Sequence, residues 1–133
     1  MSNSKTFGQR LRELRLAKKL SQRELAKRVA ARLREEDRRG FDFTYLSKIE
    51  NDRLPPPSVL AIVQLAAELD ADSDELLALG GKAPPDVGEA FKKSAGARAF
   101  FRSAINLNLS EEEWKRLLEN LEKNRSGKDR RLI

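Results

Sequence analysis

The sequence predicts an all-α protein, and three observations lead to that class. Apolar residues recur at three- and four-residue spacing along most of the chain, which is the period of helices buried on one face. Capping boxes precede two of these stripes, with a serine hydroxyl and a glutamate carboxylate three residues later satisfying each other's backbone amides: Ser21 with Glu24, and Ser110 with Glu113. Proline and glycine fall between the stripes, where helices end.

Five helices are expected in the first part of the chain, over about 6–19, 22–39, 43–51, 58–69 and 73–79. Gly40 permits the left-handed backbone of a tight turn before the third helix, and the Asp42 carboxylate is suited to cap that helix. Three consecutive prolines at 55–57 make a stiff connector after it, because each proline fixes its own φ and disfavours helix in the residue before it.

The charged segment 27–39 is the least certain part of this pattern. It contains strong helix formers and no proline, and Leu25, Val29 and Leu33 continue one apolar stripe at four-residue spacing. We therefore predict one elongated second helix that includes the segment. A disordered charged loop is the alternative.

Residues 82–85 have the composition of a linker, so we expect a first domain over 1–82 and a C-terminal helical segment over 83–133. Helices are expected over 86–93, over 97–104 and from Glu111 onward, with a frayed basic tail over 126–133. Roughly 48 residues are too few for a comfortable core of their own. Dimer or partner contact and packing on the first domain are equally open for the apolar side chains of this segment: Phe91, Phe100, Phe101, Trp114, Leu117 and Leu121.

Charge and residue types narrow the function. The net charge is +6, but residues 1–57 carry 15 basic and 8 acidic side chains, whereas 58–81 carry 5 acidic and none basic. A basic segment beside an acidic one suits a protein that lays one surface on a polyanion. The absence of Cys and His excludes disulfides, thiol or histidine catalysis and Cys/His zinc sites within the chain, and we expect no cofactor and no metal.

The same composition bears on localisation. The lack of cysteine fits a cytoplasmic protein, the first seven residues are too polar for a secretory signal, and no apolar run approaches the roughly 20 residues that span a bilayer. We therefore expect a cytoplasmic protein that does not contact a membrane.

The second and third predicted helices carry a family resemblance. The matching residues are Leu20, Ser21, Gln22, Leu25, Ala26, Gly40, Tyr45, Leu46, Ser47, Ile49, Glu50 and Asn51, and the pattern continues through 57–58, 65–66, 69 and 74–77. Over about residues 6–80 the chain resembles the helix-turn-helix domain of the Cro/phage-repressor (xenobiotic-response-element, XRE) family. The resemblance implies a five-helix lambda-repressor-like domain, and segment 27–39 departs from it by about ten extra residues.

The resemblance also implies roles for individual residues. Base edges in the major groove of double-stranded DNA would be read by Phe43, Thr44, Ser47 and Lys48. The DNA backbone would be held by Ser21, Gln22, Arg23, Asn51 and Arg53. Arg15 and Glu50 would form a structural ion pair that orients the reading helix. Three alternatives remain open: Phe43 packs in the core, and Arg23 and Arg53 are solvated charges.

The function that follows is a sequence-specific transcriptional regulator, a repressor that binds a palindromic operator as a homodimer. A second hypothesis is an antitoxin-like or peptidase-partnered regulator, whose C-terminal helices bind a toxin or are cut by a peptidase within 97–108. An enzyme is the third hypothesis, with Glu111–Glu113 as the only candidate carboxylates. Because negative charge stabilises the first turn of a helix, we expect those carboxylates to be structural and expect no catalytic residue.

Overall fold

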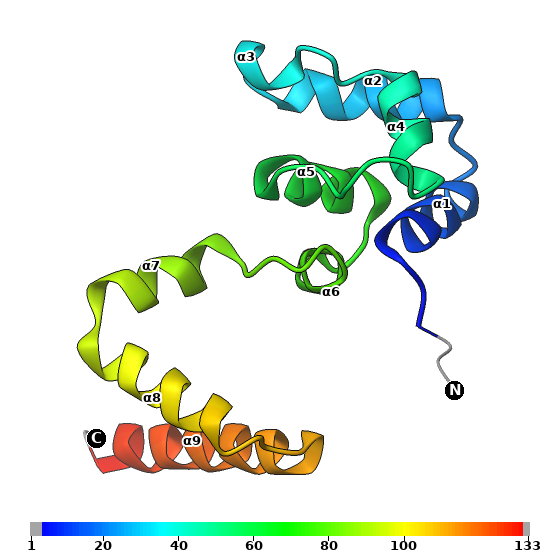
Figure 1. The fold of residues 1–133 in the computed structure, drawn as a ribbon. Helices are drawn as coiled ribbons and strands as arrows, with labels where there is room; N and C mark the ends of the chain where they lie inside the picture. The colour runs from blue at the N-terminus through cyan, green and yellow to red at the C-terminus, as the bar shows by residue number, and fades with distance from the viewer. Residues whose placement is uncertain (1–3, 132–133) are drawn as a thin grey trace. The chain divides into compact units, whose positions relative to one another are not determined.

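The computed structural model describes the backbone of residues 4–131 and the side chains of residues 4–126. Every regular element in that range is a helix, which confirms the all-α class (Figure 1). Two compact units divide the chain, Met1–Gly88 and Glu89–Ile133. The helices are α1 (Phe7–Ala17), α2 (Gln22–Arg32), α3 (Glu35–Arg38), α4 (Phe43–Glu50), α5 (Val59–Leu69), α6 (Ser73–Leu79), α7 (Pro85–Lys93), α8 (Ala95–Asn106) and α9 (Glu111–Arg131).

Helices α1, α2, α4, α5 and α6 begin at capping residues that satisfy free backbone amides, whereas α3 has no side-chain cap. The predicted capping box at α2 is present, with the Ser21 hydroxyl accepting from the Glu24 amide at 3.0 Å and the Glu24 carboxylate accepting from the Ser21 amide at 3.2 Å. Asp42 caps α4, as predicted, by accepting from the Tyr45 amide at 2.9 Å. These bonds join residues within three positions of one another and mark where α2 and α4 start.

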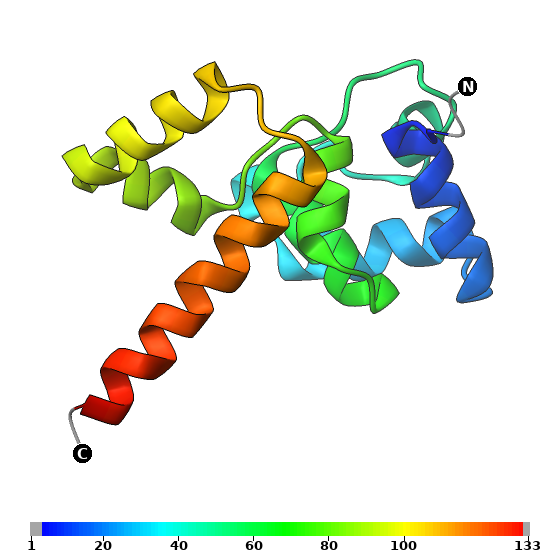
Figure 2. The same ribbon diagram turned by 90° about the horizontal axis from the view of Figure 1, so that it is seen from below.

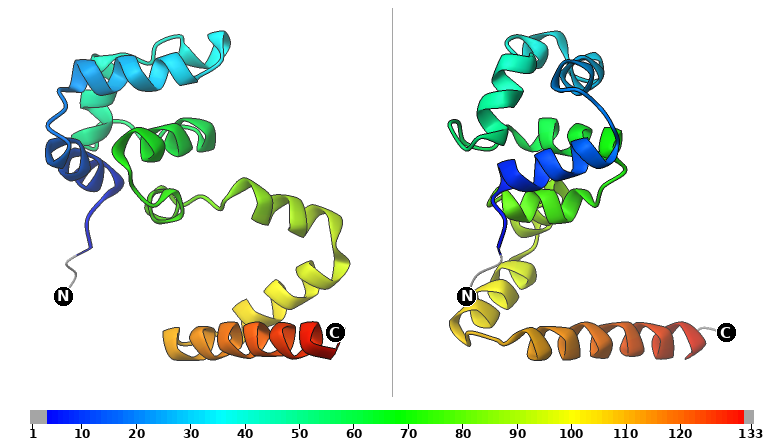
Figure 3. Two further views of the ribbon diagram at one scale, coloured as in Figure 1. Left: turned by 180° about the vertical axis from the view of Figure 1, so that it is seen from behind. Right: turned by 90° about the vertical axis from the view of Figure 1, so that its right-hand side faces the viewer.

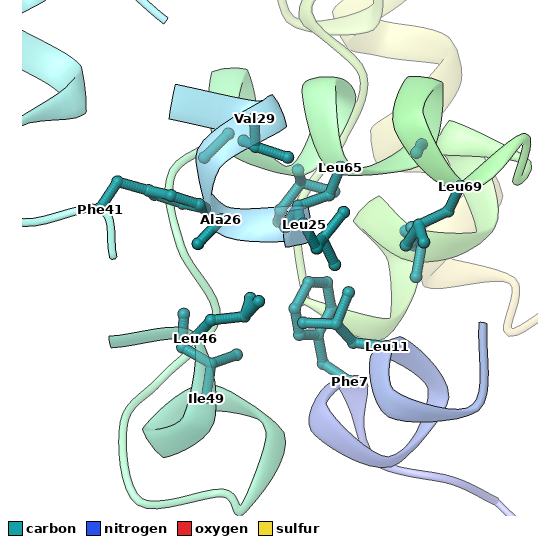
Figure 4. Close-up of a cluster of buried hydrophobic side chains, with 14 of the residues drawn as sticks. Phe7, Leu11, Leu25, Ala26, Val29, Phe41, Leu46, Ile49, Leu65 and Leu69 are labelled. Atoms are coloured by element: carbon teal, nitrogen blue, oxygen red, sulfur yellow. The ribbon is translucent and has the colours of Figure 1, made fainter. Parts of the chain in front are cut away.

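A single hydrophobic core holds α1, α2, α4, α5 and α6 together. α2 packs against both α4 and α5, while α1 packs against α4 and α5 against α6. Figure 4 shows side chains from α1, α2, α4 and α5 meeting in this core. Its fully buried larger members are Leu11, Leu25, Val29, Leu46, Ile49, Ile62, Leu65, Leu76 and Leu77.

The predicted elongated second helix is wrong in its second half. α2 ends at Arg32, and Leu33 adopts an extended backbone (φ −93°, ψ 157°) while its side chain is only 6% exposed. The chain turns at that point because Leu33 joins the core, and Arg38 closes the turn by donating to the Leu33 carbonyl at 3.2 Å. The acidic residues that follow Arg34 begin the short helix α3, where their charge favours a first turn.

Gly40 and Phe41 determine how the chain runs from the end of α3 to the start of α4. Gly40 has a φ of 78°, the left-handed conformation that the sequence indicated. Phe41, next in the chain, is buried and packs edge-on against Tyr45 with ring centroids 5.4 Å apart. Because Phe41 is buried, the extra residues of segment 27–39 do not separate the start of α4 from the core.

Gly8 marks the closest approach of α1 to α4. A Cβ at this position would lie 2.3 Å from the carbonyl oxygen of Ile49 and 2.8 Å from that of Glu50. Both are backbone atoms at the end of α4, so they cannot move aside without moving the helix. Glycine thus allows α1 to sit directly against the last turn of α4.

We expect Gly8→Ala to destabilise the first unit by about 1–3 kcal/mol, because the methyl group overpacks a rigid contact between two helices. The matched control is Gly88→Ala in α7, where a Cβ meets nothing within 4 Å and alanine favours helix. Urea unfolding of the two variants measures the difference. Equal midpoints for Gly8→Ala and wild type would show that α1 can shift without cost.

The second unit consists of the end of α7, α8 and the long helix α9 (Figure 2). Arg98 of α8 donates to the carbonyls of Phe91 and Lys92 at 2.9 Å each, which caps the end of α7. The predicted capping box at α9 is present, with the Ser110 hydroxyl accepting from the Glu113 amide at 3.2 Å. Figure 3 shows α9 as one continuous helix, and a groove lies between α8 and the first part of α9.

The prediction of a frayed tail over 126–133 is wrong for residues 126–131, because α9 continues as helix to Arg131. Residues 132 and 133 lie outside the described residues. Within the described residues, no helix is long and apolar enough to cross a membrane. The same part of the chain holds no group of three or more Asp and Glu side chains arranged to bind a metal ion.

Candidate nucleic-acid interface

α4 divides into a buried face and an open face. Leu46, Ile49 and Glu50 are buried, whereas Thr44 and Lys48 are exposed and Ser47 is half-buried. Tyr45 lies between the two faces, and partial burial raises the pKa of its phenol. Three of the four residues predicted to read bases, Thr44, Ser47 and Lys48, are therefore accessible on one side of one short helix.

A buried ion pair holds the last turn of α4. The Arg15 guanidinium donates to both carboxylate oxygens of Glu50, from Nε to Oε2 at 2.7 Å and from Nη2 to Oε1 at 2.9 Å. Arg15 also donates from Nη1 to the Leu20 carbonyl at 2.8 Å. The two residues are 8% and 4% exposed, so the pair is shielded from water. This two-bond geometry fixes the orientation of α4 relative to α1.

Gln22 links the start of α2 to the same pair. Its Nε2 donates to Glu50 Oε1 at 3.0 Å, and the side chain is partly buried. One amide hydrogen is thereby used inside the protein, while the second hydrogen on the same nitrogen has no partner within the described residues. The first residue of α2 and the last residue of α4 are consequently held together. We call this junction of Gln22 with Glu50 the corner.

Arg23, the second residue of α2, meets Phe43, the first residue of α4. The guanidinium carbon of Arg23 lies 3.7 Å from the centroid of the Phe43 ring. Phe43 is half-buried and Arg23 is exposed, so the contact lies at the surface and outside the hydrophobic core. The sequence predicted both residues at the site but gave no sign that they stack on each other.

The remaining residues predicted to contact the DNA backbone flank the junction where Gln22 meets Glu50. Hydrogen bonds from the Ser21 backbone amide and hydroxyl lower the pKa of Glu24. Asn51 is exposed and donates from its side chain to the Ser47 carbonyl at 2.9 Å. Arg53 is exposed, and its backbone amide donates to the Lys48 carbonyl at 2.8 Å. Asn51 and Arg53 thus flank the C-terminal end of α4, while Ser21 and Gln22 flank the N-terminal end of α2.

The residues of the predicted dimer or partner surface all lie in the second unit. Phe91 and Phe101 pack with ring centroids 6.1 Å apart, and Phe100 meets Phe101 at 5.7 Å. Phe100 is nevertheless 50% exposed, and Leu121 is 67% exposed. A groove of about 310 Å³ runs between α8 and α9, with Leu117 among its lining residues. Ala104 is the only buried side chain among the described residues of this unit.

The candidate carboxylates for catalysis lie in the first turn of α9. Glu111, Glu112 and Glu113 are all exposed. The Glu113 carboxylate accepts from the Ser110 amide at 3.0 Å, and that bond lowers its pKa. Glu113 thus serves the helix cap.

Comparison with known proteins defines the class. A family model described as "Helix-turn-helix domain" matches residues 8–82, which is more than half of the chain. The chain belongs to this helix-turn-helix family, and the resemblance to XRE-type regulators is confirmed.

A curated relative and a solved structure extend the comparison. Over 130 residues the chain is 30% identical to the uncharacterized HTH-type transcriptional regulator RghRB of Bacillus subtilis (strain 168), covering 88% of this chain and 86% of that protein. Among solved structures, the SinR protein/SinI protein complex is similar with 22% identity and a TM-score of 0.45, over 91% of this chain and 99% of that chain. The family assignment rests on the family model and the curated relative.

Proposed function

We propose that this helix-turn-helix regulator is a cytoplasmic repressor that binds a palindromic operator in double-stranded DNA as a homodimer. The observation that carries the proposal is the open face of α4, which is anchored at its end by the buried Arg15–Glu50 pair. Selection of bound sequences from random DNA tests binding, half-site symmetry and spacing together. A failure to enrich any sequence would contradict the proposal.

The shape of the corner supports insertion into DNA. A helix about 10–12 Å across fits the major groove, where each base pair presents a distinct pattern of donors and acceptors. Lys48 donates to guanine O6 and N7 in this arrangement, and Thr44 bonds to a base edge or contacts a thymine methyl. Ser47 lies at the edge of the same face.

The start of α2 supports a backbone clamp. Its free amides carry partial positive charge, and a phosphate is favoured at such a helix N-terminus. Because Glu50 already occupies one amide hydrogen of Gln22, the second hydrogen of that side chain reaches the phosphate. Ser21 adds a hydroxyl there. Asn51 and Arg53, which follow the end of α4, contact the DNA backbone beside it.

The second unit supports the homodimer. Most of its large apolar side chains are exposed in the single chain, including Trp114 at 37%. A second copy that covers α8 and α9 would bury them and fill the groove between the two helices. Two reading helices held this way would lie about one turn of DNA apart, roughly 34 Å.

The peptidase-partnered alternative receives less support. The segment 97–108, in which this hypothesis places the cleavage site, lies mostly within α8. Exposed loop tips, and not regular helices, are the preferred sites of proteolytic nicking. Limited digestion of the full chain would revive the alternative if the first cut fell inside 97–106.

We expect Lys48→Ala to weaken binding to the selected operator by about 1–3 kcal/mol and to relax the preference at one base pair per half-site, because a charge-assisted bond to a base is lost. The matched control is Arg53→Ala, which removes a phosphate contact. That variant should lose affinity on operator and random DNA alike and lower the salt slope by about one unit per half-site. Equal losses of Lys48→Ala on both DNAs would assign Lys48 to the backbone.

A further inference from the structure

Arg23 and Phe43 form one stacked pair across the gap between α2 and α4. The 3.7 Å separation of the guanidinium carbon from the ring centroid places the cation over the face of the ring. At this distance the arginine gains cation–π attraction. The contact restrains the Arg23 guanidinium against the ring, although the residue is exposed.

The contact with Phe43 does not use the N–H donors of the guanidinium. Within the described part of the chain, Arg23 has no hydrogen bond and no ion pair. Its five N–H donors lie in a rigid plane, and that fork matches two acceptors side by side. Gln22, the neighbouring residue, differs because one of its two amide hydrogens is already donated to Glu50.

Apolar side chains adjoin these donors. A depression of about 210 Å³ between α2 and the start of α4 is lined by Arg23, Phe43, Ala26, the buried Phe41 and the exposed Lys27. Asp42 also borders it, but the Asp42 carboxylate is engaged with the Tyr45 amide in the helix cap. A guanidinium edge beside an apolar depression matches a guanine next to a thymine, because guanine presents O6 and N7 as paired acceptors and thymine presents a methyl group.

We propose that Arg23 and Phe43 act together as a specificity-determining unit, with Arg23 donating to guanine O6 and N7 and Phe43 contacting the methyl group of a thymine on the adjacent base pair. Phe43 also positions the guanidinium that reads the guanine. The proposal rests on the proposed function, since it requires α4 to enter the major groove. It assigns Arg23 to a DNA base, whereas the family resemblance implied a contact with the DNA backbone.

Substitutions that keep charge or apolar character separate this role from a phosphate contact. The full chain is used, on the operator selected from random DNA. Arg23→Lys retains the positive charge but loses the planar fork, and Phe43→Leu retains an apolar side chain but loses the ring face. Arg28→Lys, at another exposed arginine of α2, is the matched control.

We expect Arg23→Lys to bind the operator about 5- to 150-fold more weakly and random DNA as wild type does, with relaxed preference at one guanine per half-site. Phe43→Leu should relax the same guanine, and the double variant should be no weaker than the weaker single variant, because the two side chains act as a unit. Arg28→Lys should bind as wild type does. Circular dichroism melting verifies that each variant is folded.

Modified bases identify the atoms. Replacing that guanine by 7-deazaguanine removes the N7 acceptor, so it should weaken wild type and leave Arg23→Lys no weaker than before. Replacing the adjacent thymine by uracil removes the methyl group, so it should weaken wild type more than Phe43→Ala.

Two results would overturn the proposal while leaving DNA binding intact. One is Arg23→Lys binding operator and random DNA as wild type does, which makes Arg23 a phosphate contact or a solvated charge. The other is an equal effect of 7-deazaguanine on wild type and Arg23→Lys at every guanine of the site. Failure of the wild-type chain to enrich any operator would instead contradict the proposed function itself.

Discussion

Glu50→Ala is expected to lower the free energy of unfolding of the first unit by about 3–5 kcal/mol, because it leaves the buried Arg15 guanidinium without its counter-charge. Arg15 would keep only the Leu20 carbonyl as an acceptor, and Gln22 would lose its partner as well. Thermal unfolding followed by circular dichroism should show a Tm lower by at least about 10 °C. A Tm within a degree or two of wild type would contradict the buried geometry.

Two controls isolate the cause. Glu75→Ala breaks an ion pair with Arg10 whose carboxylate is exposed, so it should change stability by about 1 kcal/mol or less. Arg15→Met combined with Glu50→Leu removes both charges and should recover much of the loss, since apolar replacements of a buried pair are often neutral. No recovery in the double variant would mean that the pair is needed for its shape and not only for its charge balance.

Removal of all residues after Pro85 is expected to convert a dimer into a folded monomer. The fragment retains α1 to α6 and the complete core, so it should keep helical circular dichroism and a cooperative melt. It should bind a palindromic operator about 10²- to 10⁴-fold more weakly, because two linked reading helices gain effective concentration. Binding to a single half-site should hardly change.

Sedimentation of the full chain and the fragment decides between the interpretations of the second unit. Trp114→Ala in the full chain should also weaken the dimer, because Trp114 is proposed as a buried anchor there. Lys115→Ala, at an exposed charged position on the same helix, should not. A full chain that is monomeric at tens of micromolar, or a fragment that dimerises equally well, would show that the apolar surface of the second unit is not the dimer contact.

The fold was largely predictable because its signals are local. Capping boxes, apolar stripes and Gly40 each act within a few residues, and the helix starts at α2, α4 and α9 follow them. The division of the second helix was not predictable in this way. Segment 27–39 has a helical composition, but Leu33 turns out of the helix because the core of distant helices offers it a buried position.

The candidate site likewise has features that local sequence signals predicted and features that depend on contacts between helices. Residue types and spacing placed Thr44, Ser47 and Lys48 on an open face of a short capped helix, because helical periodicity alone separates the faces. Periodicity carries no information about which side chains from different helices touch. The commitment of Gln22 to Glu50 and the stack of Arg23 on Phe43 depend on the crossing of α2 and α4.

The sequence by itself determined that this protein is an all-α helix-turn-helix regulator, where most of its helices begin, and which residues lie on the open face of α4. Only the tertiary structure decided that segment 27–39 breaks at Leu33, that Gln22 supports the buried ion pair, and that Arg23 and Phe43 form a unit. The physical reason is the range of the interactions. Caps and periodicity are set by neighbours in the chain, whereas burial and stacking are set by residues brought together only when the core forms.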